Sequence, residues 1–363
     1  MRVTHERRTP RRMVSILATL GLMAGMLSVL TAAASAAPTK TCRVENTTLG
    51  KRYAPSIGAS LQLAINDAAS GSTLEVRGRC VGVFSISNKT LELIGVATRK
   101  FPVASLDGNG ANDHVVSVSL GSVVTFTGLR ITGAHCLMGC LGGGISNFGT
   151  IILNGSTQVT GNFASGGGGI FNDSTGTVVL EDGSTVSGNT ADDSGGGLFS
   201  RGTVTLHDSS SVSGNTAGTV GGGIVNDATG IVTLNDSSSV THNDAAMNGG
   251  GIFSLGSVTL NDSSSVSSNR AGNAGGGILT GEDGTVTLND SSSVRGNTAT
   301  NDGGGIYNND GGVTLHGSSS VSGNTAGLRG GGIFNVASPA ILNESSSVSG
   351  NTAPTCPDTY PCT

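Results

Sequence analysis

The segment LNDSSSVRGNTATNDGGGIYN (residues 288–308) contains one unit of the pattern that dominates this 363-residue chain. Nearly the same segment stands at residues 206–226 (LHDSSSVSGNTAGTVGGGIVN) and at residues 315–335 (LHGSSSVSGNTAGLRGGGIFN). Sequence this rich in Ser and Gly and this poor in charge is also typical of disordered chains. Here, however, Leu, Val, Asn and Ile return at fixed positions, which indicates small residues on tight turns around a narrow core.

The spacing of these residues indicates the coils of a solenoid. The aliphatic residue after each Gly run recurs every 25 to 28 residues, and a fixed period of this size is typical of solenoids. These aliphatic residues are Ile145, Ile170, Leu198, Ile224, Ile252, Ile278, Ile306 and Ile333. Each unit also contains a Leu followed nine residues later by an Asn, as in Leu206 and Asn215. The length varies mainly at one corner, between the aliphatic residue and the next Leu.

Within a unit, the residues alternate as they do in β-strands. In TVTLHDSSSV (residues 203–212), Val204 and Leu206 point one way, and the threonines between them point the other way. Each unit is therefore interpreted as three short strands, GTVTL, SSSVS and GGGI, with turns at NDS, at GNTA and at the variable corner. Stacking these units predicts an all-β fold, a single-stranded parallel β-helix with about 27 residues per coil.

Stacking also assigns structural roles to the repeated residues. Val204, Leu206, Val212 and Ile224 would head four apolar columns inside the tube. Asn215 and its equivalents would occupy a left-handed turn position and hydrogen-bond from coil to coil as a ladder. The Gly triplets would permit close approach of the backbone.

Four segments are predicted along the chain. Residues 1–36 combine a basic leader, an apolar stretch and the small residues AAASAA, which predicts a signal peptide cut after Ala36. A membrane anchor is the alternative, but the Gly content and the AxA ending favour a signal peptide. The remaining segments are an N-terminal cap with the first irregular coils (37–140), the regular coils (141–352) and a C-terminal disulfide loop (353–363). Within the cap, IGASLQLAINDAAS (57–70) has Leu61, Ile65 and Ala68 at the spacing of a short capping helix.

The charge distribution argues against several partners. Residues 1–36 hold five of the 19 basic and one of the 24 acidic residues, which leaves 14 basic and 23 acidic residues and a net charge of −9. Such a surface repels phosphate backbones, so we expect neither nucleic acid nor an anionic membrane as partner. No membrane span is expected once the signal peptide is removed, and the protein is expected to be secreted, either released outside the cell or held at its surface.

An even number of cysteines in an exported chain predicts disulfides. Six cysteines allow 15 connectivities, and proximity in sequence favours Cys42–Cys80, Cys136–Cys140 and Cys356–Cys362. A zinc site is the weaker alternative, because only His135 lies near a cysteine.

Several stretches carry a family resemblance. SLQLAINDAASGSTLEV (60–76), LDGNG (106–110), GLRITG (128–133) and the Gly-Gly-Gly-Ile-aromatic-Asn repeats resemble exported bacterial proteins of the pectin-lyase-like, right-handed parallel β-helix superfamily. The GGGIFN units are also similar to the repeats of chlamydial polymorphic membrane proteins. The resemblance covers roughly residues 56 to 352 and implies a right-handed coil. It selects no activity, because the superfamily contains lyases, hydrolases and adhesins.

Catalytic candidates are few, and the sequence assigns no catalytic residue and no metal ligand. Lysine is absent after Lys100, and the later arginines occupy different repeat positions, unlike the basic clusters of related lyases. Asp107, Asp113 and His114 in LDGNGANDHVV (106–116) are the candidates for an enzyme, but turn formation is the favoured interpretation of these residues.

One column of acidic residues raises the question of a cofactor. Asp208, Asp236, Asp262 and Asp290 fall at the same turn of successive units and would stack. Calcium could bridge them. We favour turn capping instead, and we therefore expect no cofactor.

One further column is a candidate binding surface. The residues directly after the inward aliphatic positions include Phe171, Phe199, Phe253, Tyr307 and Phe334. Neighbours in a strand face opposite ways, so this column would form an outward apolar stripe that contacts a partner. If the chain bends there, these residues would instead be core.

Taken together, these patterns favour an exported, non-enzymatic β-helix that serves as an adhesive or structural module outside the cell or at its surface. Its expected partner is an extracellular polysaccharide or a cell-surface molecule. The alternative is a polysaccharide-active enzyme, pectate-lyase-like or a glycoside hydrolase, with its site on the N-terminal coils or the variable corner.

Overall fold

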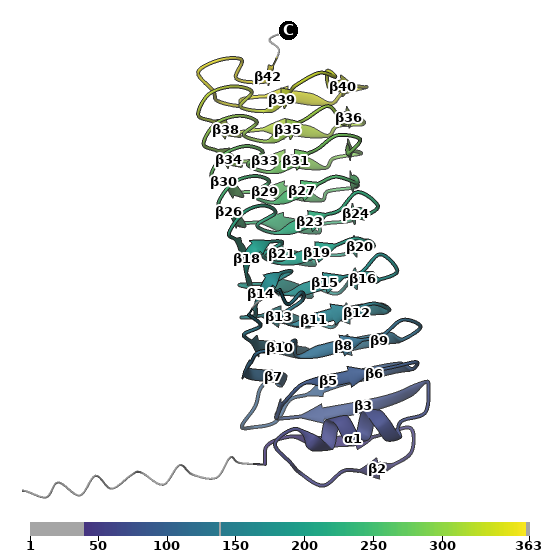
Figure 1. Cartoon of the computed structure of the whole chain (residues 1–363). Coiled ribbons are helices and arrows are strands. Elements are labelled where there is room, and N and C mark those ends of the chain that lie inside the picture. The colour runs from purple at the N-terminus through teal and green to yellow at the C-terminus, as the bar shows by residue number, and fades with distance from the viewer. Residues whose placement is uncertain (1–39, 138, 361–363) are drawn as a thin grey trace, which may run out of the picture. The chain divides into compact units, whose positions relative to one another are not determined.

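The structure is a computed structural model that describes residues 40–137 and 139–360, and it confirms the all-β parallel β-helix. Coils of about 27 residues stack on one another from the cap helix α1 (Ala59–Asp67) at one end to strand β42 at the other (Figure 1). Residues 1–36 lie outside the described residues. The part of the chain that the structure describes contains no helix long and apolar enough to cross a membrane.

The strands form four sheets, named here after the residue type that each buries. The Leu sheet has 13 strands: β2 (Lys51–Arg52), β1 (Arg43–Asn46), β3 (Ser72–Arg77), β6 (Thr90–Val96), β9 (Val123–Thr127), β12 (Thr150–Asn154), β16 (Thr177–Leu180), β20 (Thr203–Leu206), β24 (Ile231–Leu234), β28 (Ser257–Leu260), β32 (Thr285–Leu288), β36 (Gly312–Leu315) and β40 (Ile341–Leu342). The Val sheet has 11: β4 (Arg79–Val81), β7 (Ala104–Ala111), β10 (Leu129–Ala134), β13 (Gln158–Thr160), β17 (Thr185–Ser187), β21 (Ser211–Ser213), β25 (Ser239–Thr241), β29 (Ser265–Ser267), β33 (Ser293–Arg295), β37 (Ser320–Ser322) and β41 (Ser347–Ser349).

The Ile sheet also has 11 strands: β5 (Phe84–Ile86), β8 (Val116–Val118), β11 (Ile145–Asn147), β15 (Ile170–Asn172), β19 (Leu198–Ser200), β23 (Ile224–Asn226), β27 (Ile252–Ser254), β31 (Ile278–Thr280), β35 (Ile306–Asn308), β39 (Ile333–Asn335) and β42 (Thr359–Tyr360). The Ala sheet has seven short strands: β14 (Phe163–Gly166), β18 (Thr190–Ser194), β22 (Thr216–Ala217), β26 (Asp244–Ala245), β30 (Arg270–Ala271), β34 (Thr298–Ala299) and β38 (Thr325–Ala326).

The Ala sheet corrects the three-strand interpretation of the repeat. The GNTA segment was expected to be only a turn, but its last two residues, Thr216 and Ala217, pair with the neighbouring coils. Ala217 is 1% exposed, so its methyl group closes this corner of the core. A strand of two residues is too short to show any alternation. The third predicted strand also starts later, at Ile224 and not within the Gly run.

The four apolar columns lie where the sequence predicted them. Leu206 pairs in register with Leu234 and Val204 with Val232, and all four side chains are fully buried. The columns headed by Val212 and Ile224 are equally buried, and together these residues belong to one continuous core. Equivalent residues therefore stack at strand spacing, about 4.8 Å per coil.

The Asn ladder forms, although its backbone geometry differs from the prediction. The side-chain amide of Asn215 donates to Asn243 Oδ1 (3.0 Å) and to Val186 O (2.9 Å), and its own Oδ1 accepts from Asn189. The left-handed residue is the preceding Gly214 (φ 62°), and Asn215 itself is not left-handed. At the last coil, Asp358 Oδ1 replaces the next amide and accepts from the backbone and side-chain nitrogens of Asn351.

A second buried ladder runs along the ends of the Ile-sheet strands. Asn147 Nδ2 donates to Asn172 Oδ1 (2.8 Å), and Asn172 Nδ2 donates to Ser200 Oγ (3.1 Å). The same arrangement joins Asn226 to Ser254 and Asn308 to Asn335. The sequence contained a signal for it, since a small polar residue always ends the Ile-aromatic unit.

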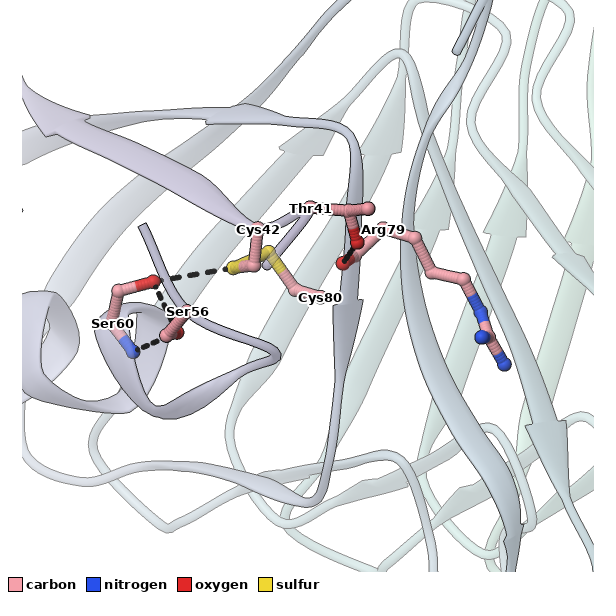
Figure 2. The surroundings of a disulfide bond; sticks show 6 residues. All are labelled: Thr41, Cys42, Ser56, Ser60, Arg79 and Cys80. Carbon is pink, nitrogen blue, oxygen red and sulfur yellow. Dashed lines mark hydrogen bonds between the residues drawn. A yellow bond between two sulfur atoms is a disulfide. The ribbon is translucent and has the colours of Figure 1, made fainter. Parts of the chain in front are cut away.

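The N-terminal cap is held by α1 and a disulfide. Leu61, Ile65 and Ala68 are buried against the first coil. Cys42 and Cys80 are bonded, and beside them the Ser60 hydroxyl lies 3.4 Å from Cys42 Sγ (Figure 2). The disulfide thus links the segment just before β1 to β4.

The other cysteines are also bonded where they are described. Cys136 and Cys140 form a disulfide. Cys356 is disulfide-bonded, and Cys362, its expected partner, lies outside the described residues.

Replacing both Cys42 and Cys80 with alanine is expected to destabilise the first coils by about 4 kcal/mol, because the disulfide closes a loop with a sequence separation of 38 residues. Urea unfolding followed by hydrogen exchange at residues 40–110 measures the effect. The matched control is Cys136→Ala with Cys140→Ala, which opens a loop with a separation of only four and should cost about half as much. A larger cost in the control would contradict the loop argument.

Candidate binding groove

The aromatic column lies on the outer side of the Ile sheet. Ile252 and Ser254 of β27 face the interior, and Phe253 between them points away from it. None of the column residues belongs to the continuous core. Alternation along each short strand therefore places the column outside the tube, as the stripe interpretation required.

The column is nevertheless largely covered. Phe171 and Phe334 are each 4% exposed, whereas Phe199, Phe253 and Tyr307 are half-buried. The cover comes from the Gly run of the same coil: a Cβ on Gly303 would lie 2.8 Å from the Tyr307 backbone. Because glycine has no side chain, the loop can lie directly against the column. Phe253 and Tyr307 thus form part of the floor of a groove, whereas Phe171 and Phe334 are covered, so the column is not one open stripe.

This groove has a volume of about 790 Å³. Its floor consists of Phe253, Leu279 and Tyr307 from three successive coils. One wall, from the loops before the Gly runs, contributes Asn248, Asn273, Ala274 and Asp302. The opposite wall is the variable corner and contributes Ala228, Leu255, Gly281, Glu282, Asp283 and Asn309. A volume of this size lies within the range of small-ligand sites.

The first wall is held by its own hydrogen bonds between coils. Asn273 Nδ2 donates to Asn248 Oδ1 (2.8 Å), and Asn301 Nδ2 donates to Asn273 Oδ1 (2.7 Å). These side chains form a short outer amide ladder that spans three coils. The wall therefore presents a row of amide groups beside the apolar floor.

A bidentate ion pair closes one end of the groove. Arg329 donates from Nε to Asp302 Oδ1 (3.0 Å) and from a guanidinium nitrogen to Asp302 Oδ2 (2.7 Å). The same guanidinium lies 4.6 Å from the centre of the Phe334 ring, which itself stacks on Tyr307 with 5.0 Å between ring centres. Two aromatic residues, one carboxylate and one guanidinium are thus fixed relative to one another.

The phenol of Tyr307 stays protonated at neutral pH. Burial raises the pKa of Tyr307 above its ordinary value, the Asp302 carboxylate raises it further, and Arg329 offsets part of this increase. The hydroxyl can therefore donate a hydrogen bond to a ligand in the groove.

The Asp302–Arg329 pair was missed at the sequence level, although a signal for it exists. Both residues directly precede the first Gly of their runs, so they occupy the same repeat position in successive coils. At another repeat position, Arg270 and Asp244 of successive coils form an exposed ion pair at 3.4 Å.

The other candidates do not converge on one site. Asp107 pairs with Arg79 (2.6 Å) and accepts from the backbone of Asn109, as a turn residue does. Asp113 contacts its neighbour His114 at 3.0 Å, and its carboxylate is half exposed. These contacts leave Asp107 engaged with a cation and with its own loop.

The stacked aspartates cap turns of neighbouring coils. Asp236 Oδ2 accepts from the backbone nitrogen of Asp208 (3.1 Å), and Asp262 does the same for Asp236 (3.1 Å). Each aspartate thus bonds the coil before it, where the sequence had predicted a cap on its own turn. Within the described residues, no group of three or more His, Cys, Asp or Glu residues is placed to hold a metal ion.

Residues 291–309 match the Chlamydia polymorphic membrane protein repeat. The match covers part of one coil, from the Ser run to the strand that contains Tyr307. Neither a curated protein nor a solved structure is significantly similar to the chain. The likeness to the pectin-lyase-like superfamily therefore stays a prediction.

Proposed function

We propose that this protein is an exported, surface-associated β-helix module that binds an uncharged polysaccharide along the groove over the Ile sheet without cleaving it. The observation that carries the proposal is the apolar floor of Phe253, Leu279 and Tyr307 set between two polar walls. The chlamydial repeat and the β-solenoid support a structural module of a cell surface. Export rests on the signal peptide expected in residues 1–36.

The chemistry of the groove suits a neutral sugar chain. Aromatic rings such as Phe253 and Tyr307 can stack on the apolar face of a pyranose ring. The amides of Asn248 and Asn273 and the Tyr307 hydroxyl supply donors and acceptors for sugar hydroxyl groups. Glu282 on the opposite wall disfavours an anionic ligand. Because floor and walls span three successive coils, a linear chain could make several weak contacts along them.

Binding without turnover is the part of the proposal that separates it from an enzyme. Hydrolysis of a glycoside requires two carboxyl groups at a defined separation. In this groove Asp302 is engaged in a bidentate pair with Arg329, which occupies both of its carboxylate oxygens. Glu282 and Asp283 are adjacent in sequence and both exposed, so they suit a solvated rim.

A binding panel with uncharged soluble glucans, mannans and xylans tests this proposal. Phe253→Ala combined with Tyr307→Ala is expected to weaken the binding of each glycan that the unmodified protein binds by about tenfold or more, because two stacking surfaces are lost. Phe199→Ala is the matched control, since Phe199 belongs to the same column but does not line the 790 Å³ groove. The same mixtures are assayed for new reducing ends and unsaturated products.

Three results would contradict the proposal. The first is that no neutral glycan binds. The second is that the Phe199 control loses as much affinity as the groove variant. The third is release of new sugar ends, and if Asp113→Ala abolishes that release, the enzyme on the N-terminal coils becomes the better account.

A further inference from the structure

A second surface gathers positive charge on the N-terminal coils of an otherwise acidic protein. Residues 37–130 contain ten basic and six acidic residues, whereas residues 131–363 contain four basic and 17 acidic residues. The net charge of the whole chain, −5, conceals this separation. The first coils therefore offer a positive field that the regular coils do not.

Eight of the ten basic residues line four adjoining hollows, called here the basic track. The hollows have volumes of about 410, 380, 540 and 400 Å³. The first and second share Arg43 and Arg77, the second and third share Lys100, and the third and fourth share Arg79. The eight residues are Lys40, Arg43, Arg52, Arg77, Arg79, Arg99, Lys100 and Arg130. The shared residues make the hollows one continuous surface.

The second hollow carries the densest charge. Five basic side chains line it, and no carboxylate does. Arg77 pairs with Glu45 and Glu75. The other four, Lys40, Arg43, Arg99 and Lys100, make no ion pair among the described residues. Their hydrogen-bond donors are therefore available to an anion from outside.

The basic track is built on a rigid framework. Figure 2 shows the disulfide between Cys42 and Cys80 next to Thr41, whose hydroxyl donates to the carbonyl of Arg79 (2.7 Å). Arg99 and Lys100 occupy the centre of a tight turn closed by mutual backbone hydrogen bonds between Thr98 and Phe101 (2.8 and 3.1 Å). A fixed backbone beneath the basic side chains reduces the conformational freedom lost on binding, which favours affinity.

We propose that the basic track binds a linear polysaccharide that carries sulfate esters. A sulfate presents three acceptor oxygens, which match the several donors converging on the second hollow, and guanidinium groups bind such oxyanions in a bidentate manner. The ring of Phe101 lines three of the four hollows and offers an apolar surface between the charged groups. Hollows in series suit successive sugar units of one chain.

The acidic remainder of the protein favours a flexible chain over an extended anionic body. A membrane or a long nucleic acid duplex would also approach the 17 carboxylates of residues 131–363, which repel it. A single oligosaccharide can remain within the basic track. The basic track and the Ile-sheet groove have no lining residue in common, so the two proposals can fail separately.

Calorimetric titration of the full chain with size-defined heparin oligosaccharides tests the inference. Arg99→Gln combined with Lys100→Gln is expected to weaken binding about tenfold or more, since both side chains are exposed and lose a charge-assisted contact. Arg270→Gln combined with Arg295→Gln removes the same charge from the regular coils and should leave affinity unchanged. Affinity should also fall as salt is raised.

Competing ligands complete the experiment. Hyaluronate carries carboxylates and no sulfate, and anionic vesicles and duplex DNA carry phosphate groups on larger bodies. The inference is overturned if heparin does not bind, if the Arg270/Arg295 variant loses as much affinity as the Arg99/Lys100 variant, or if hyaluronate, vesicles or DNA bind as tightly as heparin. Binding that persists in the Phe253→Ala, Tyr307→Ala variant separates this site from the groove.

Discussion

Asn215→Ala is expected to lower the free energy of unfolding by about 3 to 5 kcal/mol, because it breaks a fully buried ladder. The side chain is 0% exposed and accepts from both the backbone and the amide nitrogens of Asn189. It also donates to Val186 O and Asn243 Oδ1. Alanine leaves the Asn189 backbone N–H buried without this partner, and such a group bears its full desolvation penalty.

Hydrogen exchange across residues 180–250, together with urea unfolding, measures the loss of stability in the coils around Asn215. Repeat proteins open locally, so a global midpoint alone would understate it. The matched control is Asn261→Ala. Asn261 bonds Asn235 and Asn289 in an outer, half-buried ladder and should cost under about 1 kcal/mol. Equal costs at the two positions would contradict the role assigned to the buried ladder.

Gly222→Ala is expected to cost more than about 4 kcal/mol or to prevent folding of the neighbouring coils. A Cβ at this position would lie 2.5 Å from two backbone carbonyl oxygens of the next coil, Asp244 O and Gly250 O. Displacing Gly250 O would break the coil-to-coil hydrogen bond that it accepts from Gly223 N (3.3 Å). The substitution therefore forces the coils apart.

Soluble yield, circular dichroism and hydrogen exchange of residues 215–255 report this effect. Gly312→Ala is the control, because its Cβ would meet only Thr285 Cγ2 at 3.7 Å and its φ is not positive. That substitution should be neutral or stabilising by up to about 1 kcal/mol. A Gly222→Ala protein as stable as the control would show that the Gly runs do not pack as closely as described.

The parts of the fold that repeat could be predicted from sequence. Leu206, Val212, Ile224 and Asn215 recur at constant spacing, and any stack in register must place each above its equivalent. The Ala sheet was missed because two-residue strands carry no alternation. The left-handed backbone conformation was assigned to Asn215, but Gly214 adopts it. Both residues recur in the repeats, so the spacing alone does not show which of the two is left-handed.

The candidate sites depended on information that spacing alone does not contain. The sequence could place the aromatic column on the outer face of the Ile sheet. It could not show that the column is covered, because only the structure shows that the Gly run lies against Tyr307. The basic track could not be predicted, since Arg43, Arg77 and Lys100 belong to irregular coils without a common period. Register within the repeats, by contrast, contained the signal for the Asp302–Arg329 pair, although the pair was missed.

The most direct test of the account measures distances between spin labels on the outer face of the Leu sheet. Labels on Thr314 and on Thr205, Val179 or Ile152 lie four, five and six coils apart in the observed register. Electron double resonance should give distances near 19, 24 and 29 Å, about 4.8 Å per coil. Distances that do not increase with the number of intervening coils would contradict the stacking on which both binding surfaces depend.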